Sequence, residues 1–475
     1  ILCRWRKRNI PVTDSNFQLQ KDNIDSIHSP ITYFMQFFPE SLIRTIVEQT
    51  NLYSTQKIGV SINTNYSEIC MFIAIQIKMS ILHLPSYLMY WSKEMRFPPI
   101  ADSISLKRYQ KLRRFLHFVD NSTQFPNKLF KIQPVLDAVR NECIKIQPEQ
   151  SHSVDEQIIP AKTKYSKFRQ YNPKKPVKWG FKNMVRADSS GFMYDFYIYG
   201  GKDSKQLALS DDATHLQKSA QTVVKLCQHL PVKQNHQLFF DNWFTTLDLL
   251  IYLKEIGINA CGTIRGNEDL KKNGRGAVDF RSDFNSGILV TKWYDNNAVH
   301  IGSNFVGIEP MSTIDRWSSE IKEKVPIQCP QIITMYNKGM GGVDLADMLI
   351  SLYRTEVKTR RWYIKIFWHC IDIAKVNAWL LYRRHCNEMS ISKKSQRTLL
   401  KRKLENDTLP GKKPFTPTPN EILRFDQISH WPEPRSQRGR CRLCKSGYSQ
   451  IYCSKCHVCL CLKSSNNCFK EFHCK

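Results

Sequence analysis

The stretch HQLFFDNWFTTLDLL, residues His236–Leu250, decides the fold of this chain. It begins with a short apolar run that is typical of a buried strand, and the run stops at one carboxylate, Asp241. From Thr245 onwards, leucines recur at helical spacing. A carboxylate buried beside aromatic residues costs several kcal/mol unless something neutralises its charge. The stretch therefore predicts a strand, a turn and a helix of an α/β fold, with a charge that needs a partner.

Segments on either side extend this pattern. Residues 31–149 repeat apolar residues at three- and four-residue steps, which predicts helices. The basic residues between Lys107 and Arg114 form either a solvated face or a phosphate-contacting helix. Further strands are predicted for SHSVDEQIIPA, VKWGFKNMVRAD, GFMYDFYIYGG and NACGTIRGN, because these segments are short, rich in β-branched and aromatic residues, and bounded by turns. Strands that meet helices in this order predict an α/β fold with a mixed sheet.

The composition points to a polyanionic partner. The 475 residues include 70 Lys and Arg against 42 Asp and Glu, a formal net charge of +28, so nucleic acid is the leading candidate. The basic clusters Arg4–Arg8 and Lys401–Lys403 fit nuclear import or solvated, phosphate-contacting charge equally well. The most apolar stretch, Ile69–Leu84, is too short for a membrane span and predicts a buried helix. Because the chain opens at Ile1 without Met, we expect either an artificial boundary or an incomplete N-terminus.

Carboxylates with a common local pattern mark a candidate metal site. Asp155 lies in an alternating strand pattern, Asp241 ends an apolar strand, and Asp344 follows a Gly-rich turn that leads into the helix carrying Asp347. Each alone is most often a turn or cap residue. Converging carboxylates repel one another unless a cation joins them, and Mg²⁺ (or Mn²⁺) suits oxygen ligands and phosphoryl transfer. The four residues therefore predict a catalytic Mg²⁺ site.

The C-terminal cysteines predict two Zn²⁺ ions. Two C-x2-C pairs with further Cys and His in a short segment are a strong zinc signal, and disulfides are the less favoured alternative. Seven ligands are expected from the spacing: Cys441, Cys444, Cys453, Cys456, Cys461, Cys468 and His473. We assign the eighth to Cys474, with Cys459 and His457 as open alternatives.

These residues, in this order, resemble the piggyBac-type transposases, a family with an RNase H-like catalytic core. The resemblance runs from about residue 31 to the end, through motifs such as SVDEQIIPAK, NPKKPVKWGFK, FFDNWFT, YNKGMGGVDLADM and RRWYIKIFWHCIDIAKVNAWLLYRR. It implies that Asp155, Asp241 and Asp344 are the catalytic carboxylates and that Asp347 assists. It also implies a cross-braced zinc domain that reads transposon ends.

The resemblance further implies cut-and-paste DNA transposition: nicking at transposon ends, hairpin formation and integration at TTAA, in the nucleus and by a homodimer. Arg360, Arg361 and Lys365 would neutralise DNA phosphates. The implied organisation is an N-terminal basic segment (1–30), a helical dimerisation and DNA-binding region (31–149), a core (150–266), a β-rich insertion (267–330), the core's last part with DNA-binding helices (331–386), a basic linker (387–440) and the zinc domain (441–475).

Two other classes of function remain open. One is a host-domesticated descendant that binds DNA without cutting it, and the other is a zinc-module chromatin or ubiquitin-ligase protein. The intact carboxylates favour the transposase over the first, and a cross-brace alone would not require the carboxylates upstream, which disfavours the second.

Overall fold

The computed structural model describes residues 4–11, 17–18, 25–123, 127–162, 169–173, 175–201, 209, 211–266, 274–392, 395–396, 425, 429–444 and 447–474. The chain divides into two compact units, residues 1–403 and residues 404–475, which are considered separately. Lys401–Lys403 and most of the expected linker lie outside the described residues.

The first unit begins with a layer of helices, as the apolar spacing predicts. They are α1 (Pro30–Phe37), α2 (Glu40–Ile58), α3 (Tyr66–Ile81), η1 (Tyr87–Trp91), α4 (Pro98–Ala101), α5 (Leu106–Phe115) and α6 (Gln133–Ile144). The side chains of Ser29, Asn65 and Ser105 cap α1, α3 and α5 by accepting backbone N–H groups. The apolar stretch at Ile69 lies in α3, and no described helix is long and apolar enough to cross a membrane.

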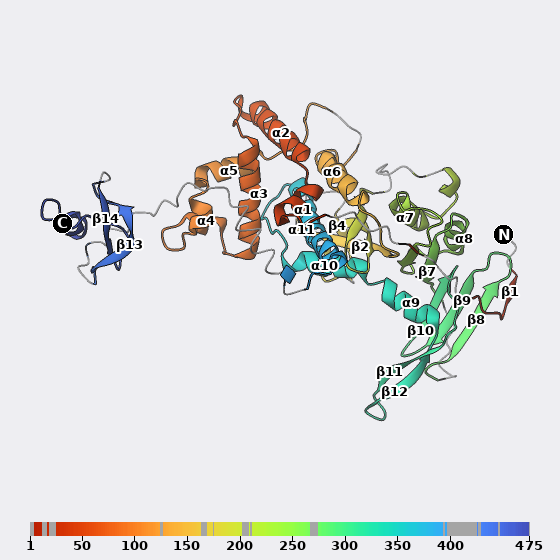
Figure 1. Cartoon of the computed structure of the whole chain (residues 1–475). Helices are drawn as coiled ribbons and strands as arrows, with labels where there is room; N and C mark the ends of the chain where they lie inside the picture. Colours follow the sequence, from red (N-terminus) through yellow and green to blue (C-terminus); the bar gives the residue numbers. More distant parts are fainter. Residues whose placement is uncertain are drawn as a thin grey trace. The chain divides into compact units, whose positions relative to one another are not determined.

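One ten-stranded mixed sheet forms the centre of this unit (Figure 1). Its order is β1-β8-β9-β10-β7-β6-β2-β4-β3, and β5 also pairs with β4. The strands are β1 (Trp5–Arg6), β2 (Ser151–Pro160), β3 (Gln170–Tyr171), β4 (Trp179–Asp188), β5 (Met193–Ile198), β6 (Gln237–Phe240), β7 (Asn259–Thr263), β8 (Val278–Asp283), β9 (Leu289–Tyr294) and β10 (Ala298–Ser303). The pairs β2–β6 and β6–β7 are parallel and the others antiparallel, which confirms the α/β class with a mixed sheet.

The β-rich segment after β7 continues the same sheet. Strand β10 pairs antiparallel with β7, with Ile301 opposite Thr263, and a hairpin around Asp295 joins β9 to β10. A separate two-stranded arm, β11 (Ser312–Ser318) and β12 (Glu323–Cys329), follows. The insertion therefore widens the central sheet as well as carrying an arm (Figure 1).

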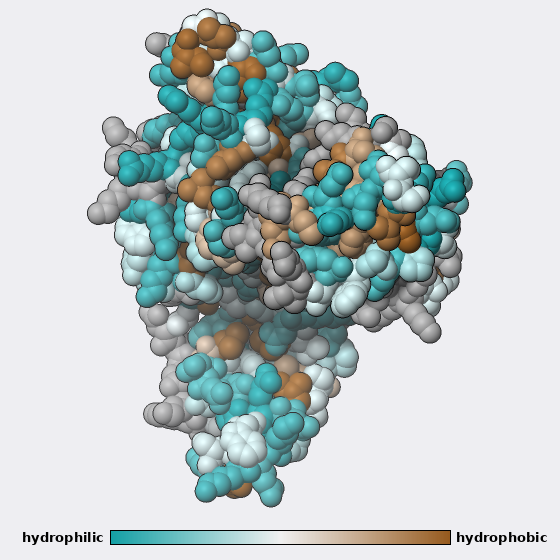
Figure 2. Space-filling model, turned by 90° about the vertical axis from the view of Figure 1, so that its left-hand side faces the viewer, coloured by the Kyte–Doolittle hydropathy of each residue, from teal (hydrophilic) through white to brown (hydrophobic). Residues whose placement is uncertain are grey.

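Helices cover both faces of the sheet. On one face, α7 (Lys218–Cys227) and α8 (Leu247–Glu255) bury apolar residues against Val154 and Phe240. On the other, α10 (Gly342–Leu352) and α11 (Trp362–Glu388) share a core with Phe181 and with the N-terminal helices, while α9 (Gln331–Gly339) packs with β6 and the insertion. In the view of Figure 2, hydrophilic residues predominate and hydrophobic ones form separate patches.

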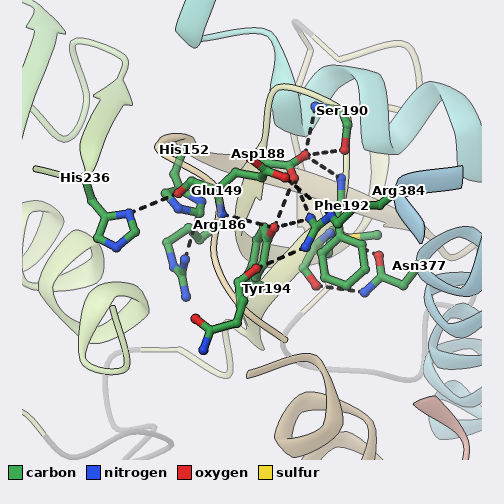
Figure 3. A network of polar contacts seen from close by, with 12 residues as sticks. Glu149, His152, Arg186, Asp188, Ser190, Phe192, Tyr194, His236, Asn377 and Arg384 are labelled. Atoms are coloured by element: carbon green, nitrogen blue, oxygen red, sulfur yellow. Dashed lines mark hydrogen bonds and ion pairs between the residues drawn. The ribbon is translucent and has the colours of Figure 1, made fainter. Parts of the chain in front are cut away.

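A buried polar network ties the sheet to α11 (Figure 3). Asp188, at the end of β4, accepts hydrogen bonds from Ser190, from the Phe192 N–H and from the Tyr194 hydroxyl, the last at 3.1 Å. The Arg384 guanidinium of α11 lies 3.3 Å from Asp188. Because the Asp188 carboxylate is buried and the Arg384 side chain is 13% exposed, the pair helps to fix the position of α11 against the sheet, and Glu149, 3.4 Å from the same guanidinium, adds to it.

The second unit is small and rich in cysteine. It contains the antiparallel pair β13 (Pro432–Arg440) and β14 (Tyr448–Cys453), with an irregularity between Pro434 and Gly439, and the short helix α14 (Cys468–His473). Its buried residues are mostly cysteines with Leu460 and Phe472. So small an apolar core requires additional cross-links, which fits the expected metal binding.

Candidate functional site

The first two candidate carboxylates lie at the same level of neighbouring strands. Asp155 is within β2 and Asp241 follows directly on β6. The two strands are parallel, with Val154 opposite Phe240, so the next residue on each is one of the two carboxylates. The strand patterns thus place Asp155 and Asp241 side by side at one edge of the core.

Asp241 also organises a tight turn. One of its carboxylate oxygens accepts the Trp243 N–H at 2.9 Å, and its carbonyl accepts the Thr245 hydroxyl at 2.8 Å. Asn242 is exposed. The turn and the metal-ligand interpretations of Asp241 are therefore compatible, because the other carboxylate oxygen takes no part in these bonds.

The Gly-rich segment before Asp344 allows α9 and α10 to approach the sheet closely. A Cβ on Gly339 would lie 2.2 Å from the Phe239 ring, and one on Gly342 would lie 2.2 Å from the Asp188 carbonyl oxygen. Gly341, the N-cap of α10, has open space instead. The two crowded glycines therefore place the start of α10, and with it Asp344, against β2 and β4.

Ser153 joins the strand of the first carboxylate to the helix of the third. Its hydroxyl accepts the Val343 N–H at 3.1 Å, one residue before Asp344 and two residues from Asp155. Asp344 stands in the first turn of α10, where a carboxylate is favoured by the helix dipole. Its side chain is 77% exposed, so this carboxylate faces solvent.

Cations lie against these carboxylates. The Lys175 ammonium is 3.3 Å from an Asp155 oxygen and 3.6 Å from an Asp344 oxygen. Asp347 accepts the Gln157 amide at 3.2 Å and lies 3.4 Å from the Arg354 guanidinium. Lys175 therefore links the first and third carboxylates, whereas Asp347 is held by its own partners.

The electrostatics show a site with excess negative charge. Burial raises the pKa of Asp155 to about 6, and repulsion from Glu156 and Asp241 adds to this although Lys175 opposes it. Burial and then the nearby Glu156 charge raise the pKa of Asp241, against the Trp243 hydrogen bond. Burial is also the main cause of the raised pKa of Tyr336, about 12, to which Asp241 and Asp155 contribute. A cation at this site would relieve the repulsion.

The donor set fits a hard divalent cation. It consists of carboxylate oxygens, which Mg²⁺ and Mn²⁺ prefer, and an ammonium already occupies a cation position between two of them. Among the described residues, however, only Cys and His groups are close enough to enclose an ion, with ligand atoms within 4.8 Å of one another. The carboxylates therefore form an open set that a metal would have to draw together.

Among the basic residues expected to contact DNA, Arg361 and Lys365 donate hydrogen bonds to carbonyl groups within the protein. The Arg361 guanidinium donates to the carbonyls of Arg113, Arg114 and Leu116, and Lys365 donates to the Val357 carbonyl. Arg360 is exposed. Arg361 and Lys365 therefore brace the segment before α11, and a phosphate-contacting role for all three stays a prediction.

The cysteine-rich unit brings together two groups of four potential ligands. The first is Cys441, Cys444, Cys461 and Cys468, and the second is His430, Cys453, Cys456 and His473. The groups interleave along the chain, as a cross-brace requires, and thiolate and imidazole sets of four suit tetrahedral Zn²⁺. In the first group, hydrogen bonds from the Gly447 backbone and from Cys441 lower the pKa of Cys444 to about 6, while burial raises that of Cys461 to about 12.

His430 is the ligand candidate that the sequence pattern missed. It lies in the segment expected to be linker, before the first C-x2-C pair, and its Nδ1 atom is 3.3 Å from the Cys453 sulfur. Cys474 and His457 are exposed and Cys459 is buried, and none of the three belongs to either group. A search for zinc ligands that also covered the histidines just before Cys441 would have found His430.

Comparisons with known proteins identify relatives of this chain. A family model described as Transposase IS4 matches residues 29–379. Human PiggyBac transposable element-derived protein 3 is 28% identical over 495 residues, which cover 100% of this chain and 81% of that protein. Human PiggyBac transposable element-derived protein 2 is 28% identical over 468 residues, covering 93% of this chain and 77% of that protein.

A solved structure is similar in fold. The cryo-EM structure of a piggyBac transposase synaptic complex with hairpin DNA has a TM-score of 0.66 and 21% sequence identity, and the match covers 92% of this chain and 97% of that one. The family model spans well over half of the chain, so this protein belongs to the piggyBac-type transposase family.

Proposed function

We propose that this protein is a DNA transposase that cuts and joins DNA strands by Mg²⁺-dependent phosphoryl transfer. The observation that carries the proposal is the placement of Asp155 and Asp241 on adjacent parallel strands, with Asp344 joined to Asp155 through one ammonium group. The family and the fold neighbour's complex with hairpin DNA support DNA as the substrate.

Asp155, Asp241 and Asp344 would hold the metal, and Asp347 would assist. When bound, the divalent cation supplies Lewis-acid activation of a phosphate oxygen and a nucleophile at neutral pH. The residues of the chain orient this site: Ser153 and Gly342 fix the start of α10 on β2, and the Asp241 turn fixes the second carboxylate. The exposure of Asp344 leaves a side open for a DNA phosphate.

The finer steps of the proposal follow the family: end nicking, hairpin formation and integration at TTAA, by a homodimer in the nucleus. In the second unit, two Zn²⁺ ions held by the two groups of four would stabilise a module that reads the transposon ends. The net charge of +28 supports a DNA partner.

A second candidate is a host-domesticated protein that binds DNA without transposing it. It is favoured by the human relatives, whose names describe them as derived from a transposable element. The two candidates differ in strand cleavage alone, because both require DNA binding.

The test uses purified full-length protein, Mg²⁺ and a plasmid that carries the sequences flanking its gene. We expect nicking by the parent, loss of nicking in Asp241→Asn, and unchanged DNA binding in a mobility-shift assay. Asp248→Asn, an exposed carboxylate seven positions away, is the matched control and should cut normally. Equal cutting by Asp241→Asn would remove the assignment, and DNA binding without cutting by the parent would favour the domesticated protein.

A further inference from the structure

Lys175 lies where a divalent cation would have to bind. Its ammonium is within 3.6 Å of oxygens from both Asp155 and Asp344, which come from β2 and α10. The Lys175 side chain is 21% exposed and that of Asp155 is 14% exposed. Among the described residues, Lys175 is the cation that forms ion pairs with two of the candidate metal ligands.

The segment between β3 and β4 holds Lys175 in this position. The Asn172 N–H donates to the Lys178 carbonyl at 2.8 Å, and this bond closes the segment on itself. The Asn172 amide also donates to Glu156, beside Asp155, at 3.2 Å. The segment is thus fastened to β2 next to the carboxylates, so the placement of the ammonium follows from the fold.

Other charges nearby have separate partners. Glu156 pairs with Lys182 at 3.4 Å and Asp347 with Arg354 at 3.4 Å, whereas Asp155 and Asp344 share one ammonium. A single positive charge cannot fully neutralise two carboxylates, while a divalent cation can. The shared pair is therefore the place where Mg²⁺ or Mn²⁺ would gain most by replacing Lys175.

We propose that Lys175 is a resident counter-ion of the catalytic carboxylates, which the metal displaces and which then contacts a phosphate of the DNA strand. This inference rests on the proposed function. Both cations need the same carboxylate oxygens, so they compete. The displaced ammonium stays within reach of the site because its flexible stem is anchored in the fastened segment, and an ammonium is a strong partner for phosphate.

This arrangement couples metal and DNA binding. Without DNA, Lys175 opposes metal binding because its two ion pairs must break first. With DNA, a phosphate takes over the ammonium, and that cost is removed. Lys175 is thus a positioning residue that favours metal loading when substrate is present.

The first measurement is the Mn²⁺ affinity of the full-length, zinc-loaded protein without DNA, from the electron paramagnetic resonance signal of free Mn²⁺. Asp155→Asn defines the binding that belongs to the carboxylates. Lys175→Met should bind Mn²⁺ about tenfold more tightly than the parent, because the competing ammonium and its two ion pairs are gone. Lys175→Arg keeps the charge and should resemble the parent, and Lys178→Met, an exposed lysine of the same segment, is the matched control. Lys175→Gln repeats the test if Lys175→Met does not fold.

The second measurement is DNA cutting at saturating Mn²⁺, where we expect Lys175→Met to be slower by about tenfold or more. Tighter metal binding together with slower cutting is a pair of changes that general damage to the fold would not produce. If Mn²⁺ binding by the parent does not depend on Asp155, the proposed function fails. If that binding depends on Asp155 but Lys175→Met binds no more tightly, the counter-ion inference fails and the proposed function stands. Normal cutting by Lys175→Met would overturn the phosphate contact.

Discussion

The glycine at the start of α10 offers the sharpest test of how the site is built. In Gly342→Ala, the new Cβ would lie 2.2 Å from the Asp188 carbonyl oxygen and 2.7 Å from the Ser153 hydroxyl oxygen. The neighbours are a backbone carbonyl and a hydroxyl that already accepts the Val343 N–H, so neither can move freely. The helix must therefore shift by roughly 1 Å to reach ordinary contact distance.

The expected magnitudes follow from this shift. Overpacking costs about 1–3 kcal/mol, and the better helix propensity of alanine returns at most about 1 kcal/mol, so the net loss lies between about 0 and 3 kcal/mol, with a centre near 1.5 kcal/mol. Because Asp344 is two residues further along α10, a 1 Å displacement of the helix start moves this carboxylate relative to Asp155. Misplacement by about 1 Å typically lowers a rate by about 100-fold.

The assay compares Gly342→Ala with Gly341→Ala, whose Cβ would meet nothing within 4 Å. Stability is measured by urea unfolding followed through tryptophan fluorescence, and function by Mg²⁺-dependent DNA nicking. Gly341→Ala should match the parent in both measurements. The reasoning is refuted if Gly342→Ala is as stable and as active as Gly341→Ala, since that would mean that α10 does not depend on close contact with β4.

Three further outcomes are expected. Burial raises the pKa of Asp155 to about 6, so ionisation of this carboxyl lowers the stability of the Mg²⁺-free protein as the pH rises from about 4 to 6. In urea unfolding, the free energy of unfolding of Asp155→Asn should equal that of the parent below this window and exceed it by at most about 3 kcal/mol above pH 6. A difference that stays constant across pH would contradict this. His430→Ala should lose one of two zinc ions by native mass spectrometry and Cys474→Ser should lose none, and the reverse result would restore Cys474 as the eighth ligand. Asp188→Asn, which removes the buried partner of Arg384 while Glu149 still lies 3.4 Å from that guanidinium, should cost about 1–3 kcal/mol, whereas the exposed Asp315→Asn should change stability by less than about 0.5 kcal/mol.

Local pattern was sufficient for the elements that carry the site. The strand that ends at Asp241 and the helix behind it follow from apolar spacing within fifteen residues, and the confirmed mixed sheet follows from such segments in order. The pairing of β10 with β7 could not be predicted in the same way. That contact depends on strand pairing, which sets Ile301 opposite Thr263, and spacing within either strand does not reveal its neighbour.

Residue type alone also did not determine the partners of the charged groups. A basic residue in a DNA-binding family suggests a phosphate contact, yet Arg361 donates to carbonyls at the end of α5, about 245 positions earlier in the chain. His430 lies outside the run of cysteines, so spacing rules did not include it among the zinc ligands. Both cases are contacts between segments distant in sequence, which only the folded chain brings together.

The two kinds of candidate metal site differ in the way that their chemistry requires. The Cys and His groups are compact and mostly buried, which suits an ion that holds a small unit together and needs no open coordination position. The carboxylates come from three separate elements, remain apart, and include one that is 77% exposed. An ion that must also bind a DNA phosphate needs such an open side. A lysine that partly neutralises the open site until substrate arrives would reconcile its two requirements, because the largely buried Asp155 needs a cation in the free protein and the phosphate needs one in the complex.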